Sequence, residues 1–111
     1  MPRGVYLGEL EQIVMLAVAR LDGDAYGMRI RREIESRAGR AVAIGAVYAT
    51  LERLEDKGYV RPLSRGRTTE TDARARRFFE LTRAGIDALR EADAVHARMW
   101  EGLPLRRSSR S

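Results

Sequence analysis

Cysteine is absent from the 111-residue sequence, and His96 is its single histidine. These absences exclude disulfide scaffolds, catalytic thiols and the ordinary zinc sites, which are built from cysteine and histidine. No apolar run approaches the roughly 20 residues of a membrane span, because Arg20 and Asp22 interrupt the longest one. Glu9 and Glu11 stand where a signal peptide has its apolar stretch, so we expect a soluble cytoplasmic protein.

Motifs for catalysis are also lacking. Asp22 lies near Asp24, and Glu52 near Asp56, but no glycine-rich phosphate loop, nucleophile motif or metal cluster accompanies these acidic pairs. The length fits one domain, which leaves no room for a large multi-domain enzyme. We therefore predict a protein that is not an enzyme and that has no cofactor and no metal site.

The formal net charge is +5, and its distribution along the chain is uneven. Residues 1–60 hold nine basic and nine acidic side chains, whereas residues 61–77 hold six arginines and two acids. Residues 104–111 add three arginines and no acid. Basic segments in an otherwise neutral chain indicate an anionic polymer as partner. A general abundance of arginine is the alternative, since Lys57 is the only lysine.

Hydrophobic periodicity predicts four helices. They cover residues 7–21, 25–38, 45–57 and 83–102. Asp24 and Thr82 are the expected N-caps of the second and the last helix, and Gly58 is expected to end the third.

Two further segments have strand character. A brief strand is expected at 41–44, and a hairpin is expected from strands at 59–60 and 75–81 joined by a polar loop at 64–72. Alternation in the second strand places Phe79 and Leu81 toward the core. The predicted fold is mainly α with a small β-hairpin, a winged helix-turn-helix in residues 1–82. Residues 83–103 form a separate C-terminal helix, and 104–111 a disordered tail.

The third helix has a sorted surface. With 100° per residue, Val47, Leu51 and Leu54 form a core stripe, and the acids fall on a different side from the bases. The candidate DNA contacts from this helix and the hairpin are Gly45, Ala46, Ala49, Thr50, Arg53, Lys57, Arg65, Arg67, Arg74 and Arg76. An ordinary amphipathic helix with a solvated acidic strip is the alternative explanation of the sorting.

Four segments resemble the PadR family of bacterial transcriptional regulators. They are LGELE at 7–11, YGMRI at 26–30, GAVYATLERLEDKGYV at 45–60 and RARRFFELTRAG at 74–85. The resemblance implies a homodimeric repressor of transcription, and it implies that Tyr48 lies near the DNA backbone. It further implies release by a small aromatic or lipophilic effector. Where the family has two glycines before a wing arginine, this chain has residues 71–73, and Asp72 is expected to weaken phosphate contact there.

The last predicted helix has apolar residues three and four positions apart. This stripe predicts a homodimer interface, and a two-fold dimer implies a palindromic DNA operator. The candidate interface residues are Ile86, Leu89, Val95, Met99 and Trp100. His96 and Trp100 share a face of this helix, so they are candidate ligand contacts, although the residues alone favour an interface tryptophan without a ligand.

Two other function classes fit a small winged helix. One is a protein-interaction module that does not bind DNA, which the basic hairpin and the sorted third helix disfavour. The other is a sequence-indifferent RNA-binding protein, which would need exposed aromatic residues among its basic ones.

Overall fold

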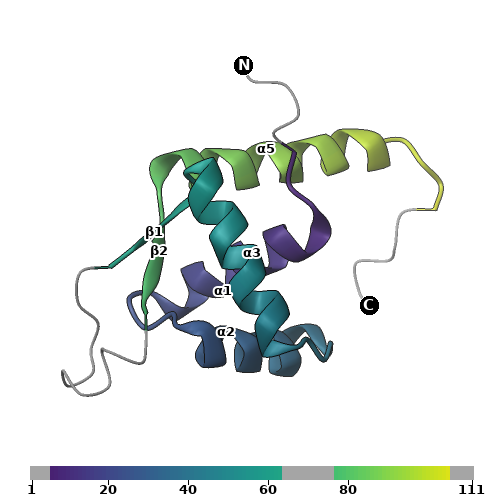
Figure 1. Cartoon of the computed structure of the whole chain (residues 1–111). Coiled ribbons are helices and arrows are strands. Elements are labelled where there is room, and N and C mark those ends of the chain that lie inside the picture. The colour runs from purple at the N-terminus through teal and green to yellow at the C-terminus, as the bar shows by residue number, and fades with distance from the viewer. Residues whose placement is uncertain (1–5, 64–76, 106–111) are drawn as a thin grey trace.

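The computed structural model describes residues 6–63 and 77–105 (Figure 1). Three predicted features lie outside the described residues: the loop at 64–72, the arginines at 65, 67, 74 and 76, and all of the tail at 104–111 except its first two residues. In chain order the elements are α1 (Glu9–Leu21), α2 (Gly27–Glu33), the π-helix η1 (Ile34–Ala38), α3 (Ile44–Lys57), β1 (Val60–Pro62), β2 (Phe79–Leu81) and α5 (Arg83–Trp100). The prediction of a mainly helical chain with one small hairpin is confirmed.

The core forms where α1, α2, α3 and the hairpin meet. Helix α1 buries Val14, Met15 and Val18, and α3 packs against both α1 and α2. Its apolar stripe of Val47, Leu51 and Leu54 is at most 1% exposed. Helix α3 ends at Gly58, whose φ of 82° is the left-handed conformation that glycine adopts at low cost.

The predicted cap of the second helix is wrong. Helix α2 starts two residues later than expected, with Tyr26 as its N-cap, because residues 25 and 26 are extended and pair with the hairpin. The N–H of Phe79 donates to the carbonyl oxygen of Ala25 at 2.9 Å, and Tyr26 forms an isolated β-bridge with Phe78. Asp24 instead makes an ion pair with Arg29 at 3.2 Å.

The strand expected at 41–44 is also wrong. Residues 40–43 have no regular structure, and Ile44 is already the first residue of α3. The carbonyl oxygen of Val42 accepts a hydrogen bond from Arg31 Nε at 3.2 Å. A side chain of α2 therefore holds this segment, in place of a neighbouring strand.

The hairpin pairs β1 with β2 in antiparallel register, with Arg61 opposite Glu80 and 2.6 Å between their charged atoms. Phe79 is buried, as predicted. Phe78, which strand alternation places on the face opposite Phe79, is buried as well, because its ring packs edge-on against Tyr26 with 5.3 Å between centroids. Phe78 thus fastens the hairpin to the segment before α2.

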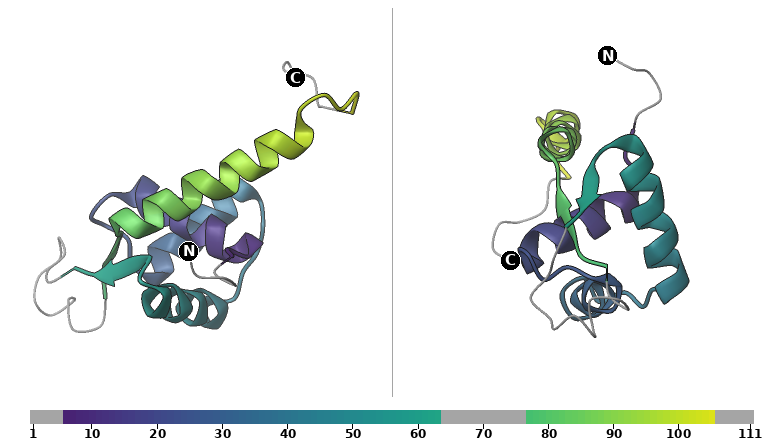
Figure 2. Two further views of the ribbon diagram at one scale, coloured as in Figure 1. Left: turned by 90° about the horizontal axis from the view of Figure 1, so that it is seen from above. Right: turned by 60° about the vertical axis from the view of Figure 1, so that its left-hand side comes forward.

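Helix α5 begins at its predicted cap, Thr82, whose hydroxyl oxygen accepts from the Gly85 N–H at 3.0 Å. A Cβ at Gly85 would lie 2.2 Å from the carbonyl oxygen of Tyr59, so only glycine lets α5 approach the hairpin this closely. The second half of α5 runs beyond the other helices (Figure 2). From Val95 to Trp100 every residue is exposed.

Candidate nucleic-acid interface

The first half of α3 presents small residues to solvent. Gly45 and Ala49 are exposed and Ala46 is half-buried. Apart from its chain neighbours and the backbone of its own helix, no atom of residues 6–63 and 77–105 would lie within 4 Å of a Cβ at Gly45, so the described residues leave this surface uncovered. We call Gly45, Ala46 and Ala49 the small-residue surface. Because these side chains are small, the helix backbone can approach another molecule closely here.

Tyr48 borders the small-residue surface and is 48% exposed. A Cβ at Gly27 would lie 2.5 Å from Tyr48 Cε1, which means that the ring rests directly on the first turn of α2. The Tyr26–Gly27 pair of the sequence therefore has a structural explanation. Tyr26 bridges to the hairpin, and Gly27 makes room for Tyr48.

Thr50, predicted to contact DNA, is completely buried, and this prediction is wrong. It lies about 60° from Val47 around the helix, and the packing of α3 between α1 and α2 covers that angle. Its hydroxyl oxygen accepts a hydrogen bond from Arg53 Nη2 at 3.3 Å. Thr50 can therefore influence a bound polymer only through Arg53.

The second half of α3 exposes acidic side chains on the face opposite the core. Glu52 and Asp56 follow Ala49 by three and seven residues, and all three are exposed. The expectation that the acids turn away from the candidate surface thus fails for this half of the helix. Phosphate groups are repelled by such carboxylates, so the small-residue surface of the first half is the better site for a nucleic acid.

Lys57, also predicted to contact DNA, is instead bound within the protein. Its Nζ lies 2.8 and 3.0 Å from the two carboxylate oxygens of Glu11, and 3.2 Å from the carbonyl oxygen of Tyr6. An ammonium group has three N–H donors, and these three acceptors occupy them. The prediction for Lys57 did not include this ion pair, because Glu11 comes from α1 and a wheel of α3 alone omits it.

The Glu11 side chain is 8% exposed and also accepts the Gly8 N–H, at 2.7 Å. Burial raises the pKa of this carboxyl group. Hydrogen bonds from Lys57 and Gly8, together with the charges of Lys57 and Arg53, outweigh burial, so the pKa of Glu11 lies below its ordinary value of 4.5. Glu11 is therefore ionised at neutral pH and links α1 to α3.

Arg53 remains a candidate contact. Its side chain is 57% exposed, and Nε lies 3.7 Å from Glu11 Oε2. Arg77, at the base of the hairpin, lies over the Phe79 ring at 5.2 Å and 3.8 Å from Glu55. The four predicted wing arginines, Arg65, Arg67, Arg74 and Arg76, fall in the segment that the structure leaves undescribed.

The predicted dimer stripe on α5 divides into two parts. Ile86 and Leu89 are half-buried, and Leu89 packs against the core of its own chain. Val95, Met99 and Trp100 are 41%, 73% and 47% exposed. A shallow apolar pocket of about 300 Å³ lies beside them. Its lining residues are Val95, His96, Met99, Trp100, Leu103 and Leu105.

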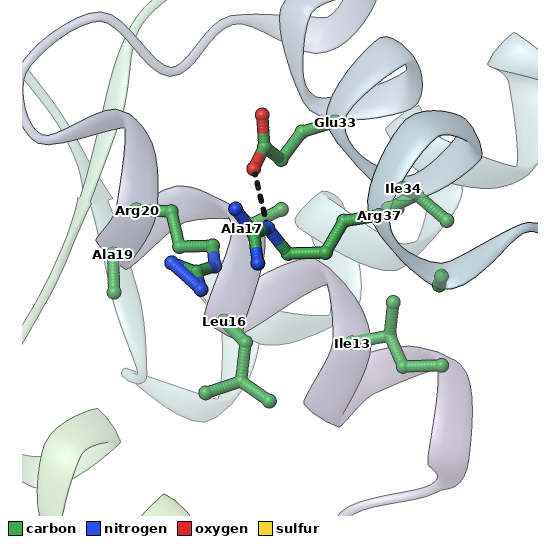
Figure 3. Close-up of a pocket in the computed structure, with 9 residues that line it drawn as sticks. Ile13, Leu16, Ala17, Ala19, Arg20, Glu33, Ile34 and Arg37 are labelled. Atoms are coloured by element: carbon green, nitrogen blue, oxygen red, sulfur yellow. Dashed lines mark hydrogen bonds and ion pairs between the residues drawn. The ribbon is translucent and has the colours of Figure 1, made fainter.

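A second apolar surface was missed by the sequence reasoning. An open groove of about 630 Å³ lies between α1 and the α2–η1 segment, with Ile13, Leu16 and Ile34 among its apolar residues (Figure 3). Arg20 and Arg37 contribute guanidinium groups to it, and Arg37 pairs with Glu33 at 3.4 Å. The available signal was Leu16, a large apolar residue outside the core stripe of α1, which is 52% exposed.

Three packed helices followed by a hairpin define a winged helix-turn-helix protein, with α3 in the position of the recognition helix. The sequence model of the "Transcriptional regulator PadR-like family" matches residues 15–91 of this chain. The chain belongs to this family of transcriptional regulators. The family consists of non-enzymatic DNA-binding proteins, which agrees with the prediction that the chain is not an enzyme.

Solved structures support the fold. RosR from H. salinarum superposes with a TM-score of 0.68 at 24% identity, covering 91% of this chain and 84% of that chain. A transcriptional regulator from Clostridium thermocellum gives a TM-score of 0.66 at 21% identity, covering 83% of this chain and 86% of that chain. A PadR family transcriptional regulator from Eggerthella lenta gives a TM-score of 0.62 at 23% identity, covering 85% of this chain and 81% of that chain. A comparison with curated proteins gives no match.

Two other kinds of feature are absent from the described part of the chain. None of the helices in residues 6–63 and 77–105 combines the length and hydropathy needed to span a bilayer. Within the same residues, His, Asp and Glu side chains form no group of three that would hold a metal ion.

Proposed function

We propose that this protein is a homodimeric, sequence-specific repressor that binds a palindromic operator with the first half of α3. The main observation is the small-residue surface, where Gly45 and Ala49 are exposed beside the half-exposed ring of Tyr48. Close approach of a helix backbone to a DNA groove requires such residues. The arginines of the wing then supply sequence-independent phosphate contacts.

Selection from a pool of random duplex DNA tests this function, because every possible operator sequence is present in the pool. The purified protein should enrich a palindromic sequence whose half-sites are about 10 base pairs apart, since two recognition helices of a dimer lie about 34 Å apart. A pool that stays random after several rounds would contradict the proposal. That outcome would favour a winged-helix module that binds protein.

We propose that residues 1–82 act as the DNA-binding unit and that α5 provides the dimer contact. The support is the exposed apolar part of its stripe, at Val95, Met99 and Trp100, which extends past the body of the chain. A symmetric pair of such helices would bury the same stripe on both subunits.

Met99→Asp tests the dimer contact better than a change at Leu89, because Leu89 also packs against its own core. Met99 is 73% exposed, so the fold of one chain should tolerate aspartate there. We expect the variant to be monomeric by light scattering. Ala97→Asp is the control, since Ala97 is exposed about 160° away around the helix. If Met99→Asp is still dimeric, the interface lies outside this stripe.

We further propose that a small aromatic or lipophilic effector binds beside His96 and Trp100 and releases the repressor from DNA. The exposed indole and the apolar pocket of about 300 Å³ support this site. Trp100 is the only tryptophan, so its fluorescence reports on this place alone. Phenolic acids and planar lipophilic drugs are the probes. An effector that releases DNA without changing Trp100 fluorescence would place the binding site elsewhere.

A further inference from the structure

The carboxylate of Glu11 lies between α1 and the basic side of α3. It is almost fully buried, and its two oxygens receive the Gly8 N–H and the Lys57 ammonium group. Arg53 Nε lies 3.7 Å from the same carboxylate. One buried anion thus engages both basic residues in the second half of the candidate recognition helix.

The two basic residues differ in how firmly they are held. Lys57 has all three N–H groups near protein acceptors, and its side chain is 27% exposed. Arg53 is 57% exposed and is held by an ion pair to Glu11 and a hydrogen bond to the buried Thr50 hydroxyl at 3.3 Å. Loss of the Thr50 hydroxyl group therefore loosens Arg53 alone, whereas loss of the Glu11 charge weakens the ion pairs of both residues, of which Arg53 is the more exposed.

Carboxylate and phosphate oxygens compete for the same guanidinium donors. Contacts to phosphate add affinity for every DNA sequence, because the backbone is the same throughout. An arginine that is held by its own protein contributes less to this sequence-independent affinity than one that is free to follow the backbone. Restraint of Arg53 thus favours the operator over the excess of other DNA.

We propose that Glu11 and Thr50 are positioning residues that restrain Arg53 and thereby lower the affinity of the protein for DNA of arbitrary sequence. The proposal rests on the proposed DNA-binding function and assigns a specificity role to two residues that the duplex does not touch. Glu11 is buried under α3, and Thr50 is buried within it.

Glu11→Gln tests the restraint. Glutamine keeps the size of the side chain and one oxygen that can accept from Lys57, but it removes the charge that attracts both Arg53 and Lys57. The Arg53 double variant described below separates the two residues. We expect affinity for a random duplex to rise about fivefold in 0.1 M salt, and the slope of log K against log salt to steepen by about 1, the value for one added phosphate contact. A merely structural role would weaken DNA binding and would not strengthen it.

The control is Glu91→Gln, which makes the same change in net charge. Glu91 pairs with Arg98 on the exposed side of α5 at 3.5 Å, far along the chain from α3. If Glu11→Gln and Glu91→Gln bind random DNA alike, the proposal is wrong. The double variant Glu11→Gln/Arg53→Ala has the net charge of the wild type and should return to wild-type affinity. If the double variant still binds random DNA more tightly than the wild type, a cation other than Arg53 causes the effect and the proposal is wrong.

Thr50→Val provides a second route that leaves the Glu11 ion pairs intact. Valine fills the buried position, and the loss of the hydroxyl group removes one of the two restraints on Arg53. We expect a smaller increase in affinity for random DNA than in Glu11→Gln. If Glu11→Gln fails to fold, this measurement on Thr50→Val tests the proposal in its place. Wild-type affinity in Thr50→Val would then refute the proposal.

The outcomes also separate this inference from the proposed function. If the wild type binds no sequence more tightly than random DNA but both variants gain affinity for random DNA, Glu11 and Thr50 do restrain Arg53 and the proposal of operator recognition is wrong. If the wild type binds no DNA at all, both are wrong.

Discussion

Gly45→Ala should increase the stability of the fold and decrease its affinity for DNA. Gly45 is the second residue of α3, it is exposed, and a Cβ there would meet none of the other described side chains or loops within 4 Å. Its φ is not positive, so alanine fits the backbone without strain. No contact within the part of the chain that the structure describes therefore requires glycine at this position.

The two expected effects can be given magnitudes. Alanine in place of helical glycine stabilises by roughly 0.5–1 kcal/mol, and near a helix start the lower value of about 0.5 kcal/mol applies. For a domain of this size that is an increase in Tm of about 2–4 °C. If the DNA backbone or a base edge approaches Gly45, an added methyl group costs about 1–2 kcal/mol, or about 5- to 30-fold in Kd.

Thermal unfolding followed by circular dichroism and fluorescence anisotropy with operator DNA measure the two quantities. Gly8→Ala is a suitable control, because a Cβ there would lie at an ordinary 3.7 Å from Glu11 Oε1 and Gly8 is not part of the small-residue surface. Its DNA affinity should not change. A Gly45→Ala variant with raised Tm and unchanged DNA affinity would refute the assignment of the first half of α3 to DNA.

Three further predictions concern the hairpin and the ion pairs. Gly85→Ala should lose about 1–3 kcal/mol of stability, because the methyl group would meet the Tyr59 carbonyl oxygen at 2.2 Å; an unchanged Tm would contradict that close approach. Replacing Arg74 and Arg76 together by alanine should flatten the salt dependence of DNA binding by about 2 in the log–log slope, whereas an unchanged slope would mean that the wing does not touch phosphate. Since the pKa of Glu11 is lower in the folded state than its ordinary 4.5, its stabilising contribution is full above that value and is lost as pH falls through the folded pKa. The Tm values of the wild type and Glu11→Gln should thus differ at neutral pH and converge in acid, and a difference independent of pH would contradict this.

Features that depend on neighbours in sequence were predictable. The period of Val47, Leu51 and Leu54 located α3 to within one residue, and Gly58 marked its end, since both signals are local. Thr82 likewise capped α5, because an N-cap bond joins residues only three apart.

Features that depend on distant residues were not predictable in this way. Asp24 has the right chemistry for an N-cap, but pairing of Tyr26 with Phe78 keeps the chain extended past it. Lys57 was assigned to DNA because a helical wheel of α3 contains no information on Glu11, which is 46 residues earlier. The family resemblance fixed the class of protein, while the partners of individual charged side chains required the three-dimensional arrangement.

Recognition of a specific DNA sequence is the property on which the proposed function depends. Fluorescence anisotropy with the DNA upstream of the protein's own gene, at several salt concentrations and with random DNA of equal length, measures it directly. We predict binding to the upstream DNA at least about 1,000-fold tighter than to random DNA at physiological salt. Equal affinity for the two DNAs, together with a pool selection that enriches no sequence, would contradict sequence-specific recognition.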